Sequence, residues 1–269
     1  MPCYNIYVPK KRLDTIMVER GLVKSRAFAQ RLVMAGEVRI DGQVALKPSL
    51  QVFEDAQIEI EQGEPFISRG GEKLEAALDA FQIEVAQFVC ADVGASTGGF
   101  TDCLLQHGAA RVYAIDVGKG ILHWKLRQDA RVMVMKEVNA RYVEHLPEPI
   151  DLVTIDVSFI SLRIILPVVK AWFLSGKVNP GKIIALIKPQ FEAGRAAVAH
   201  GQGVIRDPQI HRQVLLDVLE FSQKEGFGTR GLMRSPITGP KGNIEFLAYW
   251  IYPGDSASLE AMITPLFDF

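Results

Sequence analysis

Short apolar segments alternate with helical patterns from about residue 67 onward, and this alternation constrains the fold more than any other feature of the chain. The strand-like segments are residues 88–93, 111–117, 132–134, 152–157, 183–188 and 246–252. The spacing of amphipathic helices is found at residues 73–81, 100–107, 164–173 and 210–225. Such alternation predicts an α/β domain at residues 65–269 with a mostly parallel sheet, whose ligands bind at the carboxyl ends of the strands.

Several classes of protein are excluded by composition. The longest apolar candidate, residues 160–173, is interrupted by Arg163, Pro167 and Lys170, so it is too short and too polar to span a membrane. The N-terminus lacks a secretory pattern, and the 3 cysteines and 5 histidines show neither a C-x-x-C pair nor metal spacing. We therefore expect a cytoplasmic protein without a disulfide framework or a metal.

A second pattern occupies residues 1–64. Leu13, Ile16 and Met17 fit a short helix that ends at Gly21, and Ser25 can cap another helix over residues 26–34. The dipeptide at residues 41–42, Asp-Gly, lies between alternating runs and predicts a hairpin. Two helices followed by a small sheet make a separate α+β domain.

The basic residues gather in this first domain. Residues 10–31 hold seven lysines and arginines against two acids, whereas the whole chain has 30 basic and 31 acidic residues. A local positive face can bind an anion such as nucleic acid. An ordinary solvated helix surface explains the charge equally well, so charge alone does not decide.

The motifs of the first domain give a family resemblance. They are R-L-D at 12–14, G-L-V at 21–23, K-S-R at 24–26, A-G-E-V at 35–38, D-G at 41–42 and K-P at 47–48. Together they resemble the alpha-L RNA-binding domain, which is named from ribosomal protein S-four. The resemblance implies that a structured RNA is bound by Arg12, Lys24, Ser25, Arg26 and Arg31.

A glycine-rich turn follows the first strand of the second domain. Residues 92–102 read D-V-G-A-S-T-G-G-F-T-D, which is neither G-x-G-x-x-G nor a P-loop. The turn begins with Asp92, an acid that would repel a pyrophosphate. A cofactor with a cationic amino-acid end and no phosphate suits the turn better, and S-adenosylmethionine is such a molecule.

Polar residues end the next two strands. Asp116 lies 24 residues after Asp92 and can accept hydrogen bonds from ribose hydroxyls. Asn139 follows the third strand and could reach an adenine edge. Each residue alone could simply cap the next helix. Their occurrence at consecutive strand ends favours a nucleoside site.

The turn and several later motifs resemble the FtsJ-like ribose methyltransferases, and the longer string matches the TlyA-type, or haemolysin A-like, ribosomal RNA methyltransferases. The supporting segments are residues 68–74, 156–162, 188–192, 206–208 and 235–247. The resemblance implies a Rossmann-like sheet that binds S-adenosylmethionine. The cofactor-binding candidates are Asp92, Gly94, Ser96, Gly98, Gly99, Phe100, Asp116, Val117, Asn139 and Asp156.

The same resemblance implies a Lys-Asp-Lys-Glu catalytic tetrad. The motifs assign it to Lys73, Asp156, Lys188 and Glu245. A ribose 2′-hydroxyl is a poor nucleophile at neutral pH, and a lysine with a lowered pKa can orient it and take its proton. We expect Lys188 to be central, with the two carboxylates orienting it and Lys73 supporting it.

Three other functions are weighed against this one. Methylation of a base amine usually needs Asn/Asp-Pro-Pro-Tyr/Phe after the fourth strand, where this chain has D-V-S-F at 156–159. A non-catalytic RNA-binding or ribosome-assembly factor would tolerate loss of Asp92 or Lys188, and both are present. A haemolysin-like, membrane-active protein has no spanning segment to support it. The sequence therefore predicts 2′-O-methylation of ribosomal RNA, with ribosomal RNA or ribosomal subunits as the partner.

Overall fold

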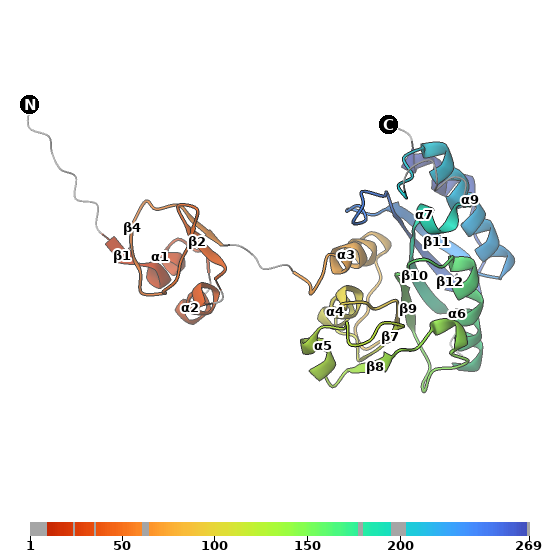
Figure 1. Cartoon of the computed structure of the whole chain (residues 1–269), viewed down its shortest axis with the longest axis horizontal. Helices are drawn as coiled ribbons and strands as arrows, with labels where there is room; N and C mark the ends of the chain where they lie inside the picture. Colours follow the sequence, from red (N-terminus) through yellow and green to blue (C-terminus); the bar gives the residue numbers. More distant parts are fainter. Residues whose placement is uncertain are drawn as a thin grey trace, which may run out of the picture. The chain divides into compact units, whose positions relative to one another are not determined.

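The computed structural model describes residues 10–23, 25–34, 36–60, 65–176, 180–194 and 203–267. It divides into two compact units, Met1–Pro65 and Phe66–Phe269 (Figure 1). Among the described residues, no helix combines the length and apolar character needed to cross a membrane.

The first unit is a small α+β domain. Its elements are β1 (Lys10–Arg12), α1 (Leu13–Glu19), α2 (Arg26–Met34), β2 (Val38–Ile40), β3 (Gln43–Val44), β4 (Gln51–Phe53) and β5 (Ile58–Ile60). The strands form a three-stranded sheet of order β3-β2-β5 and a two-stranded sheet of β1 and β4. Leu13, Met17 and Ala29 are completely buried between the helices and strands.

Two details of this unit differ from the sequence-based expectation. The first helix ends at Glu19, before the expected end at Gly21. Strand β1 was not expected at all, because its only support is pairing with β4, in which Lys10 lies opposite Phe53. Pairing between residues so far apart leaves no local pattern to read.

The second unit is built on a seven-stranded sheet. Its strands are β6 (Val89–Val93), β7 (Arg111–Asp116), β8 (Val132–Lys136), β9 (Leu152–Ile155), β10 (Gly181–Ile187), β11 (Gly228–Arg234) and β12 (Phe246–Tyr252). The order is β11-β12-β10-β9-β6-β7-β8, with β12 antiparallel to both of its neighbours and the remaining pairs parallel. This confirms the mostly parallel α/β sheet.

Helices cover both faces of this sheet (Figure 1). They are α3 (Gly70–Phe81), α4 (Gly99–Gln106), α5 (Trp124–Gln128), α6 (Leu162–Gly176), α7 (Pro189–Glu192), α9 (Pro208–Lys224) and α10 (Leu259–Ile263), with 3₁₀ turns η1 (Ala140–Tyr142) and η2 (Thr264–Leu266). Alternate strand residues enter two cores: Ile183 packs with α6 and α9, whereas Ile184 packs with α3 and α4. The period of two along β10 thus builds both layers.

Strand β11 was missed by sequence reading. Its sequence, G-T-R-G-L-M-R, contains two glycines and two arginines, and its pairing with β12 shifts register between Thr229 and Gly231. An edge strand with an irregular register has no clean alternation. The other six strands of this sheet and helices α3, α4, α6 and α9 lie within a few residues of their predicted positions, whereas the short helices α5, α7 and α10 were not predicted.

The order of the strands places a switch point between β6 and β9. The chain leaves β6 toward β7 on one side and reaches β9 on the other, so the two carboxyl ends open a crevice. The turns after them touch: a Cβ on Gly94 would lie 2.4 Å from the carbonyl oxygen of Asp156. Gly94 also has φ +85°, so only glycine fits there.

Candidate active site

Asp116 and Ser96 define the start of the crevice. Asp116 ends β7, and its carboxylate accepts hydrogen bonds from the backbone N–H groups of Ser96 (2.8 Å) and Gly118 (2.7 Å). These bonds fix the carboxylate against the glycine-rich turn. Asp116 thus has the local turn role that we weighed against ligand binding, and it remains at the rim of a cavity.

That cavity, which we call the turn cavity, has a volume of about 630 Å³. Six of the expected cofactor-binding residues line it, namely Gly94, Ser96, Asp116, Val117, Asn139 and Asp156. Apolar side chains such as Ile115, Ile121 and Ile164 form other parts of its wall. An apolar pocket with few polar groups at one end suits a nucleoside-like ligand.

Asn139 lies where its strand position predicts. Its Oδ1 accepts a hydrogen bond from the backbone N–H of Arg141 at 3.1 Å, and so caps the turn η1. The amide oxygen is therefore used locally, while the amide nitrogen is not part of this cap. Asn139 can offer the turn cavity a donor.

The remaining four expected cofactor residues do not line the turn cavity. Gly98 and Gly99 build the start of α4, where a Cβ on either would lie closer than 2.5 Å to neighbouring atoms. Phe100 is 3% exposed and packs in the core. These three residues do not line the turn cavity. They instead shape the turn that the ligand would meet.

Asp92 is the fourth of these residues, and its side chain is completely buried. Its carboxylate accepts hydrogen bonds from the hydroxyls of Thr101 (2.6 Å) and Thr154 (3.2 Å). Burial raises the pKa of Asp92 to about 7. The side chain faces these two hydroxyls beneath the turn and does not line the turn cavity, so contact between Asp92 and the cationic end of a cofactor stays a prediction.

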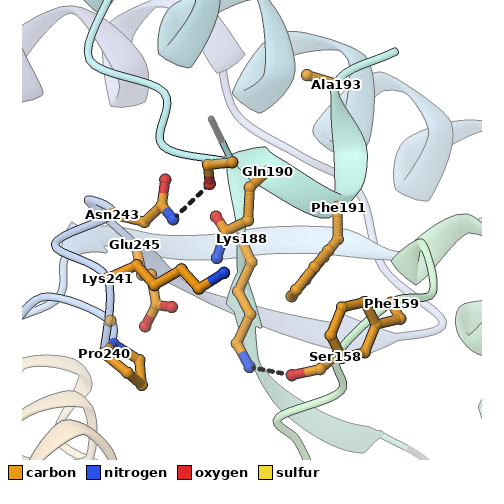
Figure 2. A pocket seen from close by; sticks show the side chains of 12 residues that line it. Ser158, Phe159, Lys188, Gln190, Phe191, Ala193, Pro240, Lys241, Asn243 and Glu245 are labelled. Atoms are coloured by element: carbon orange, nitrogen blue, oxygen red, sulfur yellow. Dashed lines mark hydrogen bonds between the residues drawn. The ribbon is translucent and has the colours of Figure 1, made fainter. Parts of the chain in front are cut away.

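Lys188 and Asp156 form a close ion pair. Lys188 follows β10 and Asp156 follows the neighbouring β9, so the parallel pairing of these strands brings the two side chains to one sheet edge. Their charged atoms are 2.5 Å apart, with side chains 11% and 23% exposed. The Lys188 ammonium also donates to the hydroxyl of Ser158 at 3.1 Å (Figure 2).

Lys73 and Glu245 form a second pair. Lys73 comes from α3 and Glu245 directly precedes β12, and their charged atoms are 2.5 Å apart at 9% and 2% side-chain exposure. The chain packs tightly there, because a Cβ on Gly239 would lie 2.6 Å from the Glu245 carboxylate. The four residues expected to form a tetrad thus occur as two lysine–carboxylate pairs.

A second cavity of about 780 Å³ contains Lys188 and Glu245 in its wall (Figure 2). We call it the lysine cavity. It shares Ser158, Phe159 and Phe191 with the turn cavity, so the two adjoin. The Lys188–Asp156 pair bridges them, since Asp156 lines one and Lys188 the other.

Phe159 is a residue of the site to which the sequence motif D-V-S-F at 156–159 assigned no role. Its side chain is 90% exposed although it is large and apolar, and its φ of +64° is rare for a bulky residue. The ring lies 4.9 Å from the ring of Phe191, centroid to centroid. Neither exposure nor backbone strain leaves a signal in a sequence.

The expected RNA-binding residues of the first unit are arranged around α2. Ser25 accepts from the backbone N–H of Phe28 at 3.3 Å, consistent with its expected capping role. Arg12 and Arg26 both bond to Asp14, and the Arg31 guanidinium lies 5.4 Å from the centre of the Phe28 ring. Lys24 lies outside the described residues.

Comparisons with known proteins agree for both units. The family of FtsJ-like methyltransferases matches residues 66–252, and the S4 domain family matches residues 11–58. The chain is 42% identical over 256 residues to the 16S/23S rRNA (cytidine-2′-O)-methyltransferase TlyA of Mycobacterium tuberculosis, covering 94% of this chain and 93% of that protein. It is 41% identical to Hemolysin A of Brachyspira hyodysenteriae, covering 89% and 99%. A solved structure from Streptococcus thermophilus, described as a candidate hemolysin, is 41% identical with a TM-score of 0.70 and 96% of each chain covered.

Proposed function

The chain belongs to the FtsJ-like methyltransferase family, and from this premise we propose that it methylates a ribose 2′-hydroxyl of ribosomal RNA with S-adenosylmethionine as the methyl donor. One observation carries the proposal: the Lys188–Asp156 pair stands between two adjoining cavities. One cavity has the features of a nucleoside cofactor site, and the other leaves room for a ribose beside a lysine.

The residues of the turn cavity fit S-adenosylmethionine. Asp116 offers a fixed carboxylate to ribose hydroxyls, and Asn139 offers an amide N–H to an adenine edge. Gly94 lets the glycine-rich turn pack directly against the backbone of Asp156, another residue of the cavity wall. The cavity volume of about 630 Å³ is in the ordinary range for sites of such ligands. When bound, the cofactor supplies an electrophilic methyl group on a positively charged sulfur.

Lys188 is the residue that we assign to the proton of the 2′-hydroxyl. With the cofactor bound, transfer would break the sulfur–methyl bond and the 2′-O–H bond and form the oxygen–methyl bond. Lys188, after losing its own proton to solvent, would accept the hydroxyl proton on its neutral amine. Asp156, at 2.5 Å, then stabilises the resulting ammonium, and Ser158 restricts where the amine can lie. Holding the hydroxyl in line with the methyl group supplies much of the rate.

Lys73 and Glu245 form the opposite part of this arrangement. Glu245 lines the lysine cavity and is held by Lys73 from α3, so its carboxylate has a fixed position near the ribose. A fixed carboxylate can accept a hydrogen bond from a sugar hydroxyl and thereby orient it. We assign Glu245 to substrate orientation and Lys73 to the positioning of Glu245.

Phe159 provides a platform for the base of the target nucleotide. An exposed aromatic ring at the junction of the two cavities can stack on a nucleobase that has been turned out of an RNA helix. Stacking would hold the attached ribose beside Lys188. The same ring would exclude water from the transferring methyl group.

The S4 domain captures the RNA in this proposal. Arg12, Arg26 and Arg31 keep part of their guanidinium groups at the surface, where they can bind phosphates. Relatives at 42% and 34% identity carry names as rRNA (cytidine-2′-O)-methyltransferases, which supports ribosomal RNA as the substrate. We propose the cytoplasm as the site of action because ribosomes are found there.

The test is methyl transfer to ribosomal subunits. Subunits from a strain that lacks this protein are incubated with the purified chain and S-adenosylmethionine carrying a labelled methyl group, and the nucleosides are analysed by mass spectrometry. We expect one or a few new 2′-O-methylated nucleosides. No methylation of either subunit, or methylation on a base alone, would refute the proposal.

A matched pair of variants ties the reaction to the site. Lys188→Ala should abolish methylation, whereas Lys182→Ala, on the same strand but packed over Phe88, should retain it. If Lys188→Ala methylates at the rate of the parent, the tetrad assignment is wrong. A non-catalytic assembly factor would bind the subunits without modifying them, and a red-cell lysis assay with the same protein tests the hemolysin name.

A further inference from the structure

Asp14 is completely buried, alone among the acids that the structure describes in the first unit, and basic side chains surround it. Arg12 donates two hydrogen bonds to its carboxylate, through Nε at 3.0 Å and Nη2 at 2.9 Å. Arg26 donates through Nε at 2.9 Å, and Gln30 donates through its amide at 2.8 Å. Two positive charges therefore share one buried negative charge.

The cluster joins three elements of the unit. Arg12 ends β1, Asp14 lies in the first turn of α1, and Arg26 and Gln30 lie one turn apart on α2. A carboxylate in the first turn of a helix is also favoured by the helix dipole. Asp14 thus fixes the relative position of the two arginines, not merely their charge.

Both arginines remain available to a ligand. The Arg12 and Arg26 side chains are 39% and 54% exposed, although Asp14 is not exposed at all. Within the described part of the chain, the bonds to Asp14 leave Nη1 of Arg12 and both terminal nitrogens of Arg26 free to donate. A guanidinium held through one edge presents its other edge in a defined direction.

Other basic residues of the same unit differ in this respect. Lys11 is 2.8 Å from both Glu19 and Glu54, so two exposed acids neutralise it. Arg20 donates to the backbone carbonyls of Glu54 and Ala56. These two side chains support the fold of the β4–β5 turn. The Asp14 cluster is instead built to keep a net positive charge at the surface.

We propose that Asp14 is a positioning residue for RNA binding: it holds Arg12 and Arg26 in the geometry in which their free N–H groups bind RNA phosphates. The proposal rests on the RNA-binding function proposed above. Ordering two long side chains before binding removes an entropic cost that RNA would otherwise have to meet. Asp14 itself does not need to touch RNA.

The proposal predicts a change in RNA affinity opposite in sign to the change that simple electrostatics predicts. Asp14→Asn removes a negative charge, and Coulomb attraction alone would then strengthen binding to a polyanion. Loss of positioning should weaken it, and we expect about tenfold lower affinity. Asp55→Asn, at an exposed acid of the same unit, makes the same charge change and should bind as tightly as the parent or slightly more tightly.

The experiment measures binding of the full chain to ribosomal subunits from a strain that lacks this protein, over a range of salt concentrations. If the phosphate contacts of both arginines are lost, the slope of log affinity against log salt should become shallower by about two for Asp14→Asn. A merely structural role would lower the active fraction without changing that slope. Affinity and slope equal to those of the parent, or tighter binding, would overturn the proposal.

A second variant decides the matter if Asp14→Asn fails to fold, as judged by circular dichroism. Arg26→Lys keeps the charge, but one ammonium cannot hold Asp14 and a phosphate in the same fork geometry. It should weaken binding several-fold, and parental affinity in this variant would reject the positioning role. If the parent chain itself neither binds nor methylates the subunits, the proposed function fails; if only the variants behave as the parent, the inference alone fails.

Discussion

Among the described residues, each unit buries one aspartate completely, and the two carboxylates have opposite surroundings. Asp14 faces two guanidinium groups, and its hydrogen bonds with Arg12 hold its pKa well below the usual range. Asp92 faces the hydroxyls of Thr101 and Thr154, and burial raises its pKa to about 7. Burial acts in the same direction on both, because removal from water disfavours the charged form.

Since burial alone would raise both pKa values, the difference between them comes from the neighbouring groups, which are positively charged at Asp14 and neutral hydroxyls at Asp92. Asp14 stays ionised and organises cations at the surface that we propose binds RNA. Asp92 is partly protonated at neutral pH, and it lies beneath a turn whose cavity already contains the carboxylates of Asp116 and Asp156. We therefore expect RNA binding by the first unit to depend on the position of its charged side chains, and methyl transfer by the second unit to depend on which of its groups can give or take a proton.

The largest effect is expected on the methylation rate of Lys188→Arg, a variant that tests whether Lys188 acts by its charge or by accepting a proton. Lys188→Arg keeps the positive charge, but arginine does not lose its proton in a protein. If Lys188 accepts the hydroxyl proton, the methylation rate should fall about 10²- to 10⁴-fold, nearly as far as in the alanine variant. Single-turnover methylation of ribosomal subunits measures this rate, and affinity for the subunits should be nearly unchanged.

Lys182→Arg is the control on the same strand, and it should react as the parent does. Substantial activity in Lys188→Arg would show that charge and orientation suffice at this position. The contrast between the two units would then disappear, because both would work through placed cations alone.

The sequence predicted this site better than it predicted the side chains beneath it. Lys188 and Asp156 could be placed together because parallel strands bring their carboxyl ends to one edge, a rule that needs no coordinates. The burial of Asp92 and Phe100 could not be predicted, since a motif does not say which side of a turn a side chain takes. The exposure of Phe159 depends likewise on a local φ of +64° that no sequence pattern announces.

The next effect concerns stability and pH at Asp92. Its pKa of about 7 in the folded protein exceeds the value near 3.8 expected when unfolded. Between these values the unfolded chain releases a proton that the folded chain retains, so rising pH favours unfolding. The second unit should therefore lose about 3 kcal/mol of unfolding free energy between pH 4 and pH 7, a loss that Asp92→Asn lacks.

Tryptophan fluorescence in urea measures this difference selectively, because all 3 tryptophans, at 124, 172 and 250, belong to the second unit. The difference in unfolding free energy between parent and variant should change with pH over this interval. A constant difference would mean that Asp92 is ionised throughout. Asp14 has the opposite sign: its stabilising contribution is complete above its ordinary pKa and is lost only as the pH falls below it.

A smaller effect is expected at Phe159, whose proposed role is stacking on a base and involves no charge. Phe159→Ala should raise the KM for ribosomal subunits about 5- to 150-fold, because stacking on a base contributes about 1–3 kcal/mol. Phe159→Trp keeps a stacking surface and should restore most of the loss. Steady-state methylation at saturating cofactor gives both values, and an unchanged KM in the alanine variant would remove the base platform from the mechanism.

The smallest effect comes from one exposed charge of the first unit, Arg31, which lies over Phe28 and outside the Asp14 cluster. If Arg31 contacts a single phosphate, Arg31→Gln should make the slope of log affinity against log salt shallower by about one, with a modest loss of affinity at physiological salt. Lys188→Ala removes a charge too, yet its partner Asp156 already neutralises it, so its slope should stay that of the parent. The two variants together test whether phosphate binding belongs to the first unit. An equal change of slope in both would mean that RNA phosphates reach the Lys188 site as well.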